Sequence, residues 1–194
     1  MDIILASGSP RRKELLTQMG LTFRVVISDA DETVDKTLPP DEQVALISRR
    51  KAEAVAELVS PDALILAADT IVALEGSIMG KPHSRQEAVE MLSRLSGKTH
   101  EVYTGFTLRR GDKTLTQTER TAVTFRELTQ EEIAAYVDTG EPMDKAGAYG
   151  IQGLGSVLVR SIHGDYFNVM GLPVCRLGLA LKEFGVQTLG EARA

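Results

Sequence analysis

The chain has 194 residues, of which 43% are hydrophobic and 25% are charged, so it can bury a core as one α/β domain. Its net charge of −5 gives no overall attraction for nucleic acids, so we expect no DNA or RNA polymer as a partner. No apolar run is long enough to cross a bilayer and no secretory leader pattern opens the chain, so we expect no membrane association and a cytoplasmic location.

The first half of the chain alternates short apolar runs with amphipathic patterns, which is typical of a mixed or parallel sheet covered by helices. An acidic stretch, residues 28–35, separates the second strand from the second helix and has no periodic pattern, so we expect it to be irregular. Strands are predicted at residues 3–6, 23–27 and 63–68, and helices from residue 10 to about 19 and from about 41 to 59.

The second half adds helices and a β-hairpin. Capping-box patterns predict helix starts at Ser84 and Thr129, and Gly140 is expected to end the second of these helices. Two β-rich runs joined by Arg110-Gly111-Asp112 predict an antiparallel hairpin, so the expected fold class is α/β with a mixed twisted sheet flanked by helices. The predicted helices cover residues 84–95, 129–140 and 173–184, and the predicted strands cover 99–109 and 113–125.

Residues 7–12 follow the first predicted strand and open the first predicted helix, which is the arrangement of an anion site. Ser9 can cap the helix and Pro10 suits its first position, so the unpaired amides of that turn project beyond the strand end. Arg11 and Arg12 add planar, permanently charged groups that match phosphate oxygens. The alternative is an ordinary capped helix whose two arginines face solvent.

Lys51 lies within the apolar stripe of the second predicted helix, which runs in steps of three and four residues through Val44, Ile47, Val55 and Leu58. A lysine in such a stripe needs an explanation. Its side chain either extends from the stripe to water or brings its ammonium to a bound anion above the sheet.

Asp69 and Lys81 are candidates of the same kind. Asp69 follows the apolar run 64–68 and is expected at the C-terminal end of a buried strand, where open α/β sheets place ligands, unless it only starts a turn. Lys81 is held in an extended conformation by Pro82, and it is either able to reach inward or an ordinary loop lysine.

The glycine-rich stretch 146–155 does not follow a strand in the dinucleotide-binding pattern. Its glycines either permit close approach of a ligand or shape turns. Within it, Gln152 carries both a donor and an acceptor, as recognition of a nucleobase edge requires.

The single cysteine, Cys175, cannot form an internal disulfide and lies in an apolar run, so we expect a small core residue. The three histidines lack metal-ligand spacing, so no zinc site is expected.

Five short strings, spread in one order over almost the whole chain, resemble the Maf family of nucleoside triphosphate pyrophosphatases. Asp69-Thr70 together with Gln152 is similar to the branch that acts on dTTP and UTP. The resemblance implies attack at the α-phosphate with release of nucleoside monophosphate and pyrophosphate, and it leaves CTP and modified pyrimidine nucleotides open as further substrates. The strings are ASGSPRR at 6–12, AADTIV at 67–72, GKP at 80–82, LSGKTH at 95–100 and YGIQG at 149–153.

The same resemblance implies a single Maf-like domain over residues 1–194, with two lobes, a central cleft, an inosine triphosphatase-like fold and a homodimeric state. It implies that Asp69 is catalytic, that Glu32 and Asp69 hold a divalent metal, and that Arg11, Thr70 and Gln152 set substrate specificity. It matches phosphate-handling positions to Arg12, Lys51 and Lys81, and we add Ser7 and Ser9 of the residue 7–12 turn as further phosphate-binding candidates.

The residues themselves are compatible with these roles. A triphosphate bears about four negative charges, and Arg12, Lys51 and Lys81 supply countercharge. Mg²⁺ or Mn²⁺ takes one or two carboxylates together with substrate phosphates, a need that Glu32 and Asp69 could meet. Two alternatives stay open, namely a non-catalytic nucleotide-binding regulator of cell division or septum formation, and a nucleotidyl or phosphoryl transferase.

Overall fold

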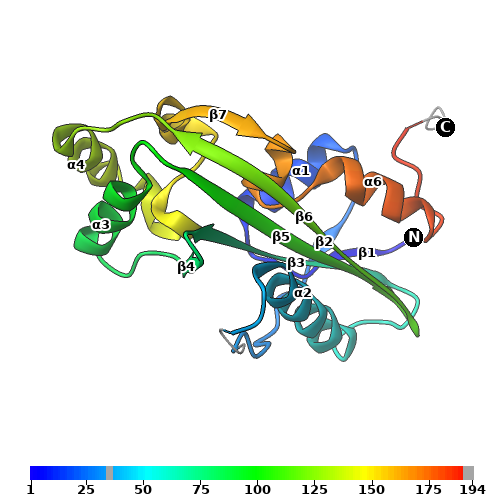
Figure 1. Cartoon of the computed structure of the whole chain (residues 1–194). Coiled ribbons are helices and arrows are strands. Elements are labelled where there is room, and N and C mark those ends of the chain that lie inside the picture. The colour runs from blue at the N-terminus through cyan, green and yellow to red at the C-terminus, as the bar shows by residue number, and fades with distance from the viewer. Residues whose placement is uncertain (34–36, 190–194) are drawn as a thin grey trace. The chain divides into compact units, whose positions relative to one another are not determined.

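The computed structural model describes residues 1–33 and 37–189. Within these residues the strands form one mixed sheet in the order β2-β1-β3-β5-β6-β7, with β4 paired to β3 (Figure 1). β1 is parallel to β2 and β3, whereas β3–β4 and β6–β7 are antiparallel, so the predicted mixed sheet is confirmed. The strands are β1 (Ile3–Leu5), β2 (Arg24–Val25), β3 (Leu64–Leu74), β4 (Ser77–Met79), β5 (Thr99–Arg110), β6 (Lys113–Phe125) and β7 (Val159–His163).

The helices follow the predicted order. The five longer ones, α1, α2, α3, α4 and α6, lie within a few residues of their predicted bounds, whereas the five-residue α5 and the short strands β4 and β7 were not predicted. None of the described helices has the length and apolar character needed to cross a membrane. The α-helices are α1 (Pro10–Gln18), α2 (Pro40–Ala56), α3 (Arg85–Leu95), α4 (Gln130–Asp138), α5 (Tyr166–Met170) and α6 (Val174–Lys182), and the 3₁₀ helices are η1 (Glu141–Asp144), η2 (Ala146–Ala148) and η3 (Gly153–Leu158).

The chain divides into two compact units. The first unit comprises residues 1–69, 104–119 and those from 171 onward, and the second comprises residues 70–103 and 120–170. Strands β3, β5 and β6 each contribute residues to both units. The expectation of a single domain with a central cleft stays a prediction.

The first unit has an apolar core on both faces of β1 and β3. Leu5, Leu64 and Leu66 are buried on one face, and Figure 1 shows α1 and α6 on the side opposite α2. On the other face, small and β-branched residues let α2 lie close to the strands. This second cluster consists of Ile4, Ala6, Ala52, Val55, Ala63, Ile65 and Ala67.

The second unit is built around α3, α4 and the adjoining parts of β5 and β6. α3 packs against α4, and both begin with the predicted caps: Ser84 accepts a hydrogen bond from the Glu87 amide, and Thr129 forms a complete capping box with Glu132. In the same unit, three rings meet edge to face with centroids 4.8 to 5.3 Å apart. The rings belong to His100, Phe125 and Tyr149.

Two core predictions are wrong. Leu58 is 61% exposed because α2 ends two residues before it, so the apolar stripe stops at Val55. Cys175 is exposed, because α6 buries Leu177, Ala180 and Leu181 and the cysteine lies on the opposite side of that helix.

Candidate functional site

The loop between β1 and α1 is held by side chains that point back into the protein. Pro10 occupies the first turn as predicted, and Ser9 occupies the N-cap position. The predicted side-chain cap is wrong, because Ser9 makes no such bond and instead donates its amide to Ser7 Oγ at 3.2 Å. The Ser7 hydroxyl also accepts from Arg12 Nη1 at 3.2 Å, so Ser7 organises the loop.

Arg12 is 9% exposed, and its guanidinium bonds main-chain carbonyls from two distant parts of the chain. It donates from Nε to the Gly171 carbonyl at 2.9 Å and from Nη1 to the Ala68 carbonyl at 2.8 Å. Burial lowers the pKa of Arg12, and the negative charges of Asp69 and Glu32 oppose that shift. Arg12 therefore fixes the main chain next to Asp69.

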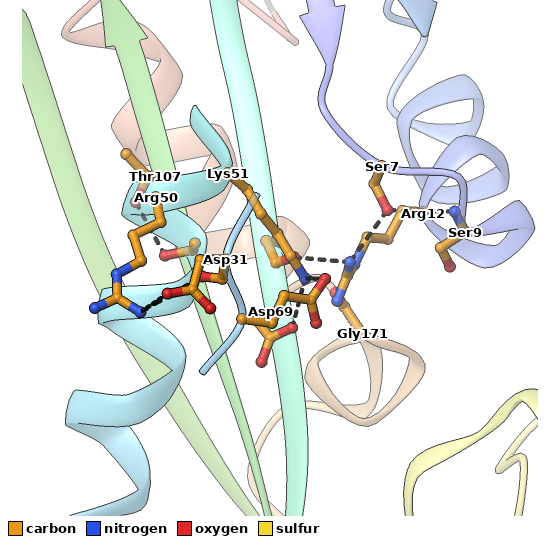
Figure 2. Close-up of polar contacts among 12 residues, drawn as sticks. Ser7, Ser9, Arg12, Asp31, Arg50, Lys51, Asp69, Thr107 and Gly171 are labelled. Atoms are coloured by element: carbon orange, nitrogen blue, oxygen red, sulfur yellow. Dashed lines mark hydrogen bonds and ion pairs between the residues drawn. The ribbon is translucent and has the colours of Figure 1, made fainter. Parts of the chain in front are cut away.

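Lys51 brings the two predicted metal-binding carboxylates together. Its Nζ lies 2.9 Å from Asp69 Oδ1 and 3.0 Å from Glu32 Oε1, and its side chain is 17% exposed. Figure 2 shows Lys51 from α2 and Arg12 from α1 pointing toward the same stretch of β3. The lysine in the apolar stripe thus reaches a charged cluster of the first unit and does not simply extend to water.

The position of Asp69 corrects the sequence prediction. Asp69 lies inside β3, which runs on to Leu74 because the apolar residues after Thr70 continue the strand. The parallel pairing with β1 ends earlier, at the pair of Leu5 with Leu66. Asp69 is therefore three residues beyond the last β1 partner, at the carboxyl end of the parallel part of the sheet, where ligands are commonly bound.

Sequence reasoning missed Arg50, which precedes Lys51 on α2. Its Nη1 donates to the Thr33 carbonyl at 2.5 Å and lies 3.8 Å from Asp31 Oδ2, as Figure 2 shows for Asp31. These contacts flank Glu32 on both sides and hold residues 31–33 against α2. The charge complementarity between that segment and the basic run at residues 49–51 was the available signal.

Three predicted site residues, Thr70, Lys81 and Gln152, belong to the second unit. Thr70 is half-buried in β3 and directly follows Asp69, so β3 passes from the first unit to the second between these two residues. Lys81 is exposed, and the Gly80 carbonyl beside it accepts the Gly147 amide at 3.0 Å. That bond ties the Lys81 loop to the glycine-rich segment that carries Gln152.

The glycine-rich segment is packed against its own unit. A Cβ at Gly153 would lie 2.8 Å from Glu141 Oε2, and one at Gly155 would lie 2.6 Å from the Tyr136 hydroxyl oxygen. These two glycines therefore approach atoms of their own unit closely, and whether the segment also admits a ligand stays a prediction.

The donor set of the first unit fits a divalent cation that shares its coordination with a substrate. Glu32 and Asp69 offer carboxylate oxygens that converge on one ammonium nitrogen. Mg²⁺ accepts one or two carboxylates and completes its shell with water and phosphate oxygens. Among the described residues, no group of three or more His, Cys, Asp or Glu side chains could hold a metal ion by itself.

Two solved structures are similar to this chain at low sequence identity. The Staphylococcus aureus Ham1 protein matches with a TM-score of 0.45 and 16% identity, covering 64% of this chain and 72% of that protein. A Mycobacterium abscessus nucleoside-triphosphatase, or dITP/XTP pyrophosphatase, matches with a TM-score of 0.44 and 11% identity, covering 95% and 97%.

Sequence relatives are much closer. A dTTP/UTP pyrophosphatase of Bacillus anthracis is 55% identical over 184 residues, which cover 95% of this chain and 96% of the relative. A dTTP/UTP pyrophosphatase of Bacillus cereus has the same identity and coverage. Residues 2–184 match the family described as Maf-like protein. With a match of this extent and relatives of this identity, the chain belongs to the Maf-like protein family.

Proposed function

We propose that this chain is a metal-dependent nucleoside triphosphate pyrophosphatase that hydrolyses dTTP and UTP to the nucleoside monophosphate and pyrophosphate. The structural observation that carries the proposal is the cluster in which Lys51 joins Asp69 and Glu32 beside the buried Arg12. The names of the relatives at 55% identity support the choice of substrate and reaction.

Asp69 acts as the general base in this proposal. Lys51 binds one carboxylate oxygen, Oδ1, and so fixes the orientation of the group. The other oxygen can then hold an attacking water and take its proton, a contribution typically worth 10²- to 10⁴-fold in rate. Arg12 supports this geometry by donating a hydrogen bond to the carbonyl of Ala68, the residue before Asp69.

We assign Glu32 and Asp69 as ligands of Mg²⁺ or Mn²⁺, which would supply Lewis-acid stabilisation of negative charge on the phosphate oxygens. Countercharge for the polyphosphate comes from protein cations, and a loop of hydroxyl and amide donors adds hydrogen bonds. The residues assigned to this role are Ser7, Ser9, Arg12, Lys51 and Lys81.

Base recognition is assigned to Arg11, Thr70 and Gln152. Thr70 and Gln152 carry groups that can pair with the carbonyl and N–H edge of uracil or thymine. A site built from such groups rejects a base that leaves them unpaired more strongly than an apolar pocket does. The homodimer and the cytoplasmic location stay predictions.

The variant Asp69→Asn tests the reaction. We expect wild-type protein to release pyrophosphate and dTMP from dTTP with Mg²⁺, and Asp69→Asn to lose at least 100-fold in kcat because the amide cannot accept the proton. Binding of dTTP, measured by calorimetry, should change much less. Asp62→Asn, an exposed carboxylate just before β3, is the matched control and should keep full turnover.

Ion-exchange chromatography of the products separates this proposal from its alternatives. Pyrophosphate with dTMP supports hydrolysis at the α-phosphate, whereas orthophosphate with dTDP would contradict that position. Triphosphate that is bound and recovered intact would instead identify a nucleotide-binding regulator. A product that forms only when an acceptor is added would identify a transferase.

A further inference from the structure

We propose that Glu141, together with Tyr136, is a positioning residue that holds Gln152 for base recognition and so sets the enzyme's discrimination between bases. The inference rests on the proposed function, because it takes Gln152 as a base-contacting residue. It assigns a role to two side chains that lie outside the predicted site.

The first step is the unusual start of the helix after Gln152. Gln152 occupies the N-cap position of η3, yet its side chain makes no capping hydrogen bond. The first amides of any helix lack partners within it and need acceptors from elsewhere. The Glu141 carboxylate supplies them, accepting the Leu154 amide at Oε2 and the Gly155 amide at Oε1, each at 3.0 Å.

The second step is the hydrogen bonding that fixes the main chain before Gln152. The Tyr136 hydroxyl donates to Glu141 Oε1 at 2.9 Å and accepts the Gly150 amide at 3.1 Å. The main chain is therefore fixed two residues before Gln152 and two residues after it, from one pair of side chains. None of these bonds uses the Gln152 side chain, so its amide is not consumed in holding its own loop.

The third step is the close packing of the loop against these two side chains. Gly153 and Gly155 approach Glu141 and Tyr136 so closely that a Cβ on either would overlap them. Lys145 adds a bond from Nζ to the Glu141 carbonyl at 2.5 Å, which fixes the main chain of the holding residue itself. A side chain that must meet a flat base edge needs its backbone fixed to this degree.

The charge of Glu141 suits this task. Burial raises the pKa of Glu141, but the amides of Gly155 and Leu154 and the Tyr136 hydroxyl outweigh that effect, so the net shift is downward. The group is thus an acceptor-only carboxylate at neutral pH and can take all three donors. Glutamine at this position would offer a single acceptor oxygen and two donors that meet other donors.

The test compares Glu141→Gln with wild type on three readouts. First, kcat/KM for dTTP should fall about tenfold, while kcat/KM for a poor substrate such as dGTP changes less than twofold. The ratio of the two kcat/KM values, which measures discrimination between bases, should therefore fall. Second, the inhibition constant of inorganic tripolyphosphate, which has no base, should stay within twofold. Third, hydrogen exchange of the peptide covering residues 149–156 should be faster.

Controls isolate the hydrogen-bond network. Tyr136→Phe should narrow discrimination in the same direction, because it removes the bond to the Gly150 amide. Glu131→Gln, an exposed carboxylate in the first turn of α4, should leave all three readouts unchanged. In a Gln152→Ala background, Glu141→Gln should narrow discrimination no further, since the residue it positions is gone.

The outcomes separate this inference from the proposed function. If wild type releases no pyrophosphate from any triphosphate, the function fails, and unchanged hydrogen exchange in Glu141→Gln would also remove the structural part of the inference. If wild type hydrolyses dTTP but Glu141→Gln keeps its discrimination within twofold, the inference is overturned and the function stands. An equal loss toward dTTP, dGTP and tripolyphosphate would mean general damage and would overturn it too.

Discussion

Arg12 and Arg11 are neighbours in one helical turn, but the protein uses their charges differently. Arg12 is 9% exposed and bonds two main-chain carbonyls and a serine hydroxyl, whereas Arg11 is half-buried. A guanidinium can reach several carbonyls at once because its donors are spread in a rigid plane. Any assay of Arg12 in phosphate binding must therefore account for its contribution to folding.

We predict that Arg12→Lys lowers the free energy of unfolding by about 3 kcal/mol, because an ammonium cannot reach the Gly171 and Ala68 carbonyls together and one buried acceptor loses its partner. Arg11→Lys, the control in the same turn, should change it by less than about 1 kcal/mol. Urea denaturation followed by circular dichroism measures both. Equal effects of the two substitutions would show that the buried bonds of Arg12 contribute little.

At this scale the sequence indicated which residues belong to the charged cluster more reliably than it indicated which hydrogen bonds they make. The misplaced lysine in an apolar stripe and the carboxylate after an apolar run pointed to Lys51 and Asp69, and their ammonium and carboxylate lie 2.9 Å apart. The residue type of Ser9 predicted a side-chain cap for its helix. Ser9 makes no such bond, and its own amide donates to the Ser7 hydroxyl. The Ser7 hydroxyl also accepts a bond from the buried Arg12, so its orientation depends on a tertiary contact that no local sequence pattern encodes.

At the scale of elements, local signals worked where the helix or strand depends on nearby residues. The capping boxes at Ser84 and Thr129 predicted the starts of α3 and α4, because cap and partner lie three residues apart. The end of β3 was missed, since Asp69 and Thr70 interrupt the apolar run although the strand continues to Leu74. Polar residues after an apolar run can therefore belong to a functional site inside a strand and need not indicate that the strand ends in a turn.

His100 makes the stability of the second unit sensitive to acid. It is 1% exposed on β5, hydrogen-bonds the Tyr149 hydroxyl at 2.8 Å, and burial lowers the pKa of His100 to about 4. An unfolded chain binds this proton near pH 6.5, so between pH 6.5 and 4 the unfolded state holds more protons. The free energy of unfolding should therefore fall as pH drops through this window, by on the order of 3 kcal/mol in full.

Urea unfolding at pH 7 and pH 5 checks this expectation. Wild type should lose about 2 kcal/mol more between these pH values than His100→Gln does, because the variant has no imidazole to charge. His163→Gln, which removes an exposed histidine from β7, should keep the wild-type pH dependence. Parallel pH curves for wild type and His100→Gln would show that burial of His100 is not what makes the protein sensitive to acid.

At the scale of the whole molecule, the predicted site residues are shared between the two compact units, with Asp69 ending a segment of the first and Thr70 beginning a segment of the second. The alternation of strands and helices predicted the fold class, since each strand or helix is encoded by a local period. Which loops hold which site residue was not predictable. The bonds from Glu141 to Leu154 and Gly155 span thirteen and fourteen residues and follow no spacing rule.

Chelation should separate activity from folding in the intact protein. The metal proposed at Glu32 and Asp69 should be needed for turnover, but Lys51 already places a positive charge within 3.0 Å of both carboxylates. We therefore expect EDTA to abolish pyrophosphate release from dTTP while lowering the Tm by no more than about 2 °C, which for a chain of this size is less than about 1 kcal/mol. Differential scanning calorimetry with EDTA and with excess Mg²⁺ measures the shift.

The matched variant is Lys51→Met, which removes the ammonium and keeps the apolar stem. Asp69, 14% exposed, then lacks its cation partner, so we expect the variant to be about 3 kcal/mol less stable than wild type in EDTA. Excess Mg²⁺ should raise its Tm by several degrees more than it raises that of wild type, because the cation takes over the charge that Lys51 balanced. A loss of about 10 °C on chelation of the wild type would instead mean that the metal is part of the fold.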